Sequence, residues 1–268
     1  MLDLTIFFDI ETLPSADARL IEEIADSIQP PSRMSKPETI AAWIANEKPE
    51  AIREAVAKTS LDGGTGRLAS IAFAVGHGDI MCEVAVEADG TSSEDTERWL
   101  LTAFFDACEA VKVKYAGAPP IMCGHNILGF DLRWLWKRAV ILGVPIPWWW
   151  PHDAKSWDTD RVYDTMVAWE GPGGRIRQDV LARRLGIKGK PGGFDGSMVA
   201  QAWIDGEHDR VRDYCADDVR CVREIYHRLT GHTTVKPRKA RKPDPAPAEI
   251  EAPPVDASEQ HEPMEVCF

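Results

Sequence analysis

The sequence is short of positive charge. It contains 31 lysine and arginine residues against 43 aspartate and glutamate residues, which gives its 268 residues a formal net charge of −12. Proteins that bind nucleic acid or anionic membranes through bulk electrostatics need positive charge. Taken alone, this balance argues against both classes and favours an enzyme that acts on small molecules.

A long apolar run is also missing. The two longest uncharged stretches, Tyr115–Phe130 and Ala139–His152, are interrupted by prolines and are shorter than the roughly 20 residues that a membrane-spanning helix needs. The N-terminal apolar stretch contains Asp3 and Asp9 and lacks the basic region and cleavage site of a secretory signal. We therefore expect a cytoplasmic protein that has no membrane partner.

Cysteines and nucleotide-binding motifs are sparse. None of the six cysteines forms a Cys-x-x-Cys pair, which predicts reduced thiols rather than a disulfide framework or a zinc site. The glycine-rich stretch 186–193 lacks the GxxxxGK[ST] pattern of a nucleotide-binding loop. That stretch is either a loop on the substrate side or a plain connector.

What is present is an alternation of strand-like and helix-like segments. Period and composition predict strands at 2–10, 67–75, 80–86, 120–124 and 162–169, and helices at 92–111, 132–142, 178–185 and 209–229. This order predicts an α/β domain with a mixed sheet. We expect residues 1–235 to form this domain, with 14–60 as a helical insertion. Residues 236–268, rich in proline and charge, are predicted to be a disordered tail that docks on a partner or only aids solubility.

The first chemical feature is Asp9 and Glu11 at the end of the first predicted strand. A spacing of two places both carboxylates on one face of the strand. Two adjacent negative charges on an apolar strand are costly unless a cation lies between them. Because hard divalent ions prefer oxygen ligands, the pair favours Mg²⁺ or Mn²⁺. The alternative is a solvated pair of acids at a strand end.

Two further features follow later in the chain. Asn126 and Asp131 lie at a predicted strand-to-helix junction, where an aspartate also serves as a helix cap and an asparagine as a turn residue. Tyr214 and Asp218 are four residues apart on a predicted helix and so share one face. Together they can position a water beside a metal, or they are a buried tyrosine and an unrelated surface acid.

In this order, the three features resemble the DEDD superfamily of 3′–5′ exonucleases, which has the ribonuclease H-like fold. Tyr214, four residues before Asp218, resembles the tyrosine branch (DEDDy). The runs FDIETLP, GHNILGFDL and DYCADDV are similar to the proofreading exonuclease domain of family-B DNA polymerases. The resemblance spans residues 3–230 and implies a mixed five-stranded sheet flanked by helices.

The resemblance also implies a function. Asp9, Glu11, Asp131 and Asp218 would bind two divalent metal ions, Mg²⁺ or Mn²⁺, and Tyr214 would orient the attacking water. The substrate-binding residues that it implies are Thr12, Leu13 and Asn126. The expected activity is two-metal hydrolysis of DNA from single-stranded or frayed 3′ ends, with release of nucleoside monophosphates.

Other partners and activities stay open at this point. The tail is a candidate contact for a replication or repair protein. An RNA-directed exonuclease or a structure-specific endonuclease of the same fold is one alternative, and a catalytically silent nucleic-acid-binding module is another.

Overall fold

The structure is a computed structural model that describes residues 4–188 and 193–231. The predicted tail, 236–268, lies outside these residues. The strands are β1 (Thr5–Leu13), β2 (Arg67–Val75), β3 (Met81–Val84), β4 (Ile121–Gly124) and β5 (Val162–Asp164). The helices are α1 (Ala18–Ser27), α2 (Pro37–Asn46), α3 (Lys48–Ala57), α4 (Glu94–Lys114), α5 (Asp131–Leu142), α6 (Thr165–Glu170), α7 (Gln178–Arg184), α8 (Val199–Ile204) and α9 (His208–Thr230), with 3₁₀ turns η2 (Lys58–Leu61) and η3 (Gly196–Met198).

The strands form one mixed sheet in the order β3-β2-β1-β4-β5. β1 pairs antiparallel with β2 and parallel with β4, so it occupies the centre of the sheet. β3 extends the antiparallel side and β5 the parallel side. The predicted mixed five-stranded sheet flanked by helices is confirmed.

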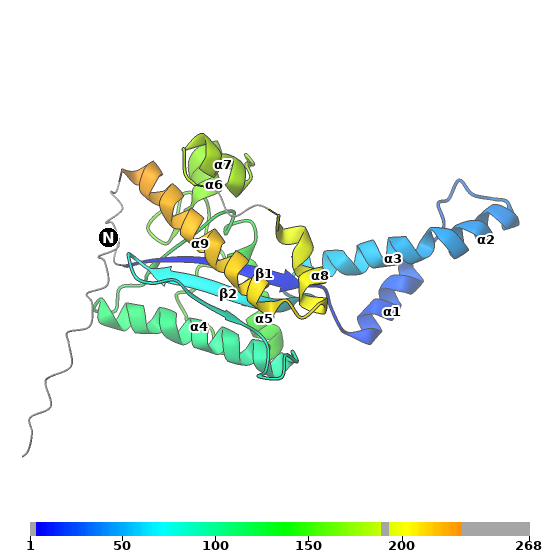
Figure 1. Cartoon of the computed structure of the whole chain (residues 1–268), viewed down its shortest axis with the longest axis horizontal. Coiled ribbons are helices and arrows are strands. Elements are labelled where there is room, and N and C mark those ends of the chain that lie inside the picture. Colours follow the sequence, from blue (N-terminus) through cyan, green and yellow to red (C-terminus); the bar gives the residue numbers. More distant parts are fainter. Residues whose placement is uncertain (1–3, 189–192, 232–268) are drawn as a thin grey trace, which may run out of the picture. The chain divides into compact units, whose positions relative to one another are not determined.

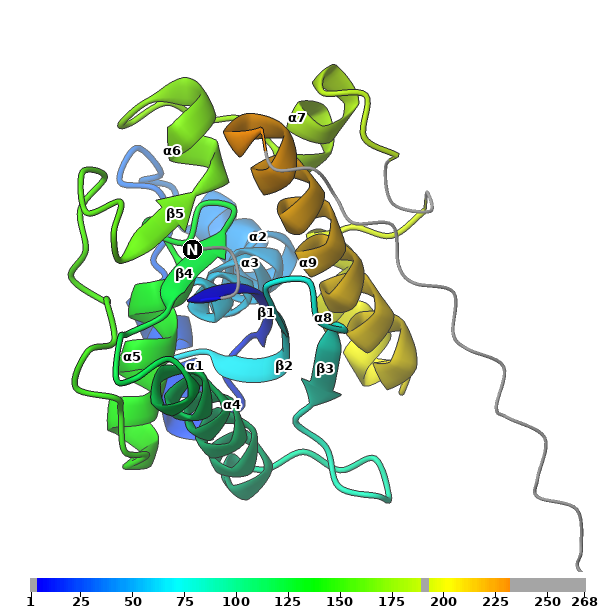
Figure 2. The same cartoon turned by 90° about the vertical axis from the view of Figure 1, so that its left-hand side faces the viewer.

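The side chains of β1 alternate between two buried layers. Ile6, Phe8 and Ile10 belong to the apolar cluster that contains the inner faces of α4 and α5. Phe7 packs in a second cluster with residues of α9. Figure 1 shows β1 and β2 between α9 and α4, and Figure 2 shows the same layers from the side. Because successive strand residues point to opposite faces, Asp9 and Glu11 share the α9 face with Phe7.

One predicted element is wrong in part. The strand expected at 162–169 ends at Asp164, and α6 begins at the next residue. The Asp164 carboxylate accepts hydrogen bonds from the backbone N–H groups of Met166 and Val167, which starts the helix. The run VYDTMV is rich in residues that favour strands. The sequence therefore predicted a longer strand and missed the helix cap at Asp164.

The predicted helical segment 14–60 contains α1, α2, α3 and η2. The C-terminal end of this segment is attached to α5, because the indole N–H of Trp134 donates a hydrogen bond to the Ser60 carbonyl at 2.9 Å. The sequence did not predict α8, which packs against α9. Among the described residues, no helix combines the length and the apolar character needed to cross a membrane.

Candidate active site

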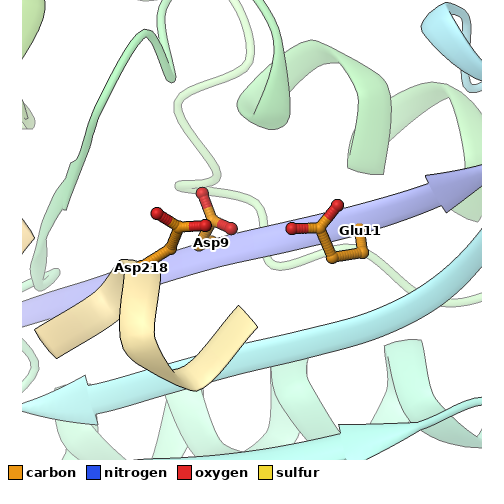
Figure 3. A group of neighbouring side chains, drawn as sticks. All are labelled: Asp9, Glu11 and Asp218. Carbon is orange, nitrogen blue, oxygen red and sulfur yellow. The ribbon is translucent and has the colours of Figure 1, made fainter. Parts of the chain in front are cut away.

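Three predicted carboxylates lie together on the α9 side of the sheet. Asp9, Glu11 and Asp218 each offer an oxygen atom, and these oxygens lie within 4.8 Å of one another. Figure 3 shows Asp9 and Glu11 on β1 with Asp218 beside them on α9. Asp218 is buried, and Asp9 and Glu11 are half-buried. An all-oxygen donor set of this kind fits Mg²⁺ or Mn²⁺.

Asp131 faces the same cleft from the first residue of α5. Burial raises the pKa of its carboxyl to about 7, and the charges of Asp164 and Asp218 act in the same direction. Hydrogen bonds from its own backbone amide and from that of Ile10 oppose the rise. Asp131 is therefore a buried acid crowded by other acids, an arrangement that a bound cation relieves. The residue at the N-cap position itself is Phe130.

Tyr214 lines the cleft one helical turn before Asp218. Its ring and that of Phe194 pack edge to face, with ring centroids 5.0 Å apart and planes at 68°. The neighbouring Asp217 instead forms an ion pair with Arg220. Because residues four apart share one face of a helix, Tyr214 and Asp218 both line the cleft, whereas Asp217 does not.

The three predicted substrate-binding residues lie in different environments. Asn126 lines the cleft; its backbone is left-handed, with φ 66°, and its N–H donates to the Asp164 carboxylate at 2.9 Å. Leu13 is 2% exposed and packs in an apolar cluster with Trp203. Neither Thr12 nor Leu13 belongs to the cleft lining. Contact of these residues with substrate stays a prediction.

The cleft has a volume of about 590 Å³ and includes side chains for which no role was predicted from the sequence. Gln178, at the start of α7, donates from Nε2 to Asp218 Oδ1 at 2.7 Å and to the Asp218 carbonyl at 3.1 Å. His125 contacts Thr165 Oγ1 through Nδ1 at 2.9 Å and the Ile176 carbonyl through Nε2 at 2.8 Å. The other lining residues without a predicted role include Arg177, Asp179, Arg183, Phe194 and Asp195.

Only part of this set had a sequence signal. His125 lies within the quoted run GHNILGFDL, directly before Asn126. Gln178 follows no motif, and its place depends on how α7 packs on α9 through Leu181, Ala182, Cys221 and Ile225.

Comparison with protein families gives a match over most of the chain. A family model described as a predicted 3′-5′ exonuclease related to the exonuclease domain of PolB matches residues 64–234. The matched region contains Asp131, Tyr214 and Asp218, whereas Asp9 and Glu11 precede it. No curated protein sequence matches the chain.

Among solved structures, the family B DNA polymerase from the hyperthermophilic archaeon Pyrobaculum calidifontis is similar, with a TM-score of 0.51 and 18% sequence identity. The alignment covers 84% of this chain but only 24% of the polymerase chain. At this identity the likeness concerns the fold, and it confirms the predicted ribonuclease H-like α/β class.

Proposed function

Because the chain belongs to the family of predicted 3′-5′ exonucleases related to the exonuclease domain of PolB, we propose that it is a metal-dependent 3′–5′ exonuclease of the tyrosine branch. Its substrate is DNA with a single-stranded or frayed 3′ end, and its products are nucleoside monophosphates. The observation that carries the proposal is the meeting of Asp9, Glu11 and Asp218 within 4.8 Å in a cleft that also contains Asp131 and Tyr214.

Asp9, Glu11, Asp131 and Asp218 would hold two divalent ions. When bound, two such ions stabilise negative charge on the attacking and leaving oxygens of phosphodiester hydrolysis and make bound water more acidic. The residues fit this role, because every donor is a hard oxygen and two of the carboxyls are at most 6% exposed. Buried carboxylates without a cation repel one another.

The proposed role of Tyr214 is to orient the attacking water with its hydroxyl group. A tyrosine has an ordinary pKa of about 10, so it keeps its proton at neutral pH and is a poor general base. In support of this role, Tyr214 lies one turn before Asp218 on α9 and lines the same cleft as the carboxylates. The contact with Phe194 restricts the ring.

The test is hydrolysis of a 5′-labelled single-stranded DNA by the full-length chain with Mg²⁺ or Mn²⁺. We expect a ladder of products shortened from the 3′ end, with nucleoside monophosphates in the soluble fraction. Asp9→Ala should reduce the rate by orders of magnitude while the melting temperature stays close to that of the wild type. Asp217→Ala, which removes a carboxylate outside the cleft, should retain full activity.

Several outcomes would contradict the proposal. Cleavage of a circular single-stranded DNA would indicate an endonuclease, and preferential digestion of RNA of the same sequence would indicate an RNA-directed exonuclease. Oligonucleotide binding without hydrolysis would favour a silent binding module. Unchanged activity of Asp9→Ala would refute the site.

A further inference from the structure

A cluster of basic residues lies beside the cleft of this acidic chain. The segment 175–184 reads RIRQDVLARR and holds four arginines against one acid, Asp179, in a chain whose net charge is −12. Most of this segment forms α7. These arginines therefore lie on or next to α7, the helix whose Gln178 donates a hydrogen bond to Asp218.

Two of these arginines face the cleft and share one acidic partner. Arg177 and Arg183 both belong to the cleft lining. Asp179 Oδ1 lies 3.1 Å from Arg177 Nε, and Asp179 Oδ2 lies 3.7 Å from an Arg183 terminal nitrogen. The arginine side chains are 76% and 68% exposed, so most of their N–H donors are accessible to solvent.

The neighbouring arginine points elsewhere. Arg184 is outside the cleft lining and lies 3.9 Å from the Glu170 carboxylate. Successive residues of a helix are turned by about 100°, which separates Arg183 from Arg184. Since Leu181 and Ala182 are fully buried in the cluster shared with α9, this orientation of α7 is fixed by packing.

From this geometry we propose that Arg177 and Arg183, joined by Asp179, form a binding subsite for the internucleotide phosphates of a single-stranded substrate. The inference rests on the proposed function and names how the cleft holds its substrate. Guanidinium groups bind phosphate oxygens in bidentate geometry. The carboxylate cluster itself repels a polyanion, so the two arginines in the lining of the same cleft supply the attraction that the overall charge does not.

The same guanidinium groups could bind one isolated phosphate, as in the monophosphate product. The experiment separates these sources with two substrates. The dinucleotide TpT contains only the scissile phosphate, whereas a thymidine decamer adds upstream phosphates. A subsite for internucleotide phosphates affects the decamer more strongly than the dinucleotide.

The test compares Arg177→Ala and Arg183→Ala with the matched control Arg184→Ala, which removes the same charge from the same helix. For each cleft variant we expect the ratio of kcat/KM on the decamer to kcat/KM on TpT to fall by about tenfold. The slope of log affinity against log salt concentration should decrease by about 0.7 for each arginine removed. Arg184→Ala should leave the ratio and the slope unchanged.

The possible failures are distinguishable. If all three variants lose decamer activity equally, the loss reflects the removal of one positive charge at any position, and the subsite is refuted. If the cleft variants lose activity equally on both substrates, or if product inhibition by thymidine monophosphate weakens in step with decamer binding, the arginines serve the terminal phosphate instead. If the wild type hydrolyses neither substrate, the proposed function fails and the subsite fails with it.

Discussion

Gln178 fixes the carboxylate of Asp218 from outside the predicted motifs. Its amide nitrogen donates both to Oδ1 and to the backbone carbonyl of Asp218, so one side chain holds two points of the same residue. Side chains that hold a metal ligand by hydrogen bonds tune its orientation, and their loss typically weakens metal affinity by about 10–100-fold. We assign Gln178 a positioning role on this basis.

We expect Gln178→Ala to raise the Mg²⁺ concentration for half-maximal activity by about tenfold and to lower kcat, with little change in thermal stability. The measurement is a metal titration of the hydrolysis rate together with calorimetry of Mn²⁺ binding. Gln201→Ala is the control, because Gln201 is an exposed glutamine on α8 that donates a hydrogen bond to Asp205 just beyond the helix. An unchanged metal requirement would show that Gln178 does not position Asp218.

At the scale of single residues, the sequence predicted which side chains share a face, because that follows from the strand or helix period. Asp9 and Glu11 share a strand face, and Tyr214 and Asp218 share a helix face. Gln178 was not predictable, because its partner lies 40 positions away in the chain and no spacing rule connects them. The burial of Leu13 was not predictable from local sequence either, because it depends on tertiary contacts in the apolar cluster that contains Trp203.

At the scale of elements, a buried ion pair joins β2, α4 and α5. Glu97 on α4 accepts two hydrogen bonds from Arg138 on α5, at 2.6 and 2.8 Å, and a third from the backbone N–H of Leu68 at 2.7 Å. The two charged side chains are 3% and 7% exposed. The pair therefore holds the two helices that cover one face of β1.

Removing one partner should be strongly destabilising. Arg138→Met removes the guanidinium that forms two hydrogen bonds with the buried Glu97 carboxylate, so we expect a loss of about 3–5 kcal/mol in the free energy of unfolding. The measurement is chemical denaturation of the purified chain. The double variant Glu97→Gln/Arg138→Met should recover much of this loss, because a neutral amide still accepts the Leu68 N–H. Equal destabilisation of the single and double variants would contradict this account.

The hydrophobic period and the capping residues of the sequence predicted most of the helices and strands. The helix expected at 92–111 begins with a capping box between Ser93 and Thr96, as the polar run before its apolar face indicates. The segment at 162–169 was predicted as a single strand because Asp164 reads locally as one strand residue among several. Only the structure shows its carboxylate accepting bonds from Asn126, Leu128 and the first turn of α6.

For the molecule as a whole, four of the 43 acidic residues meet at the proposed site. The pKa of Asp131 rises to about 7 in the folded chain because of burial first and neighbouring acids second, whereas an unfolded aspartate has a pKa of about 3.9. Between these values the folded state binds more protons than the unfolded state. The stability that Asp131 contributes therefore falls as pH rises through this window.

In EDTA, we expect the wild type to lose more thermal stability between pH 5 and pH 8 than Asp131→Asn, whose amide does not titrate. Added Mn²⁺ should restore the wild-type melting temperature at pH 8 by several degrees and have a much smaller effect on Asp131→Asn. Differential scanning calorimetry at the two pH values checks both expectations. Parallel pH profiles of the two proteins would argue against a strained Asp131 in the metal-free site.

By itself the sequence determined the alternation of strands and helices, the faces on which the predicted acids lie, and the type of chemistry that those acids can support. These properties are local, because strand and helix periods act over a few residues. Only the tertiary structure brought Asp218 to Asp9 across more than 200 positions of chain, turned Arg177 and Arg183 toward the cleft, and placed Gln178 on Asp218. Such contacts depend on which apolar faces pack together, here α9 on β1 and α7 on α9, and no residue spacing encodes that choice.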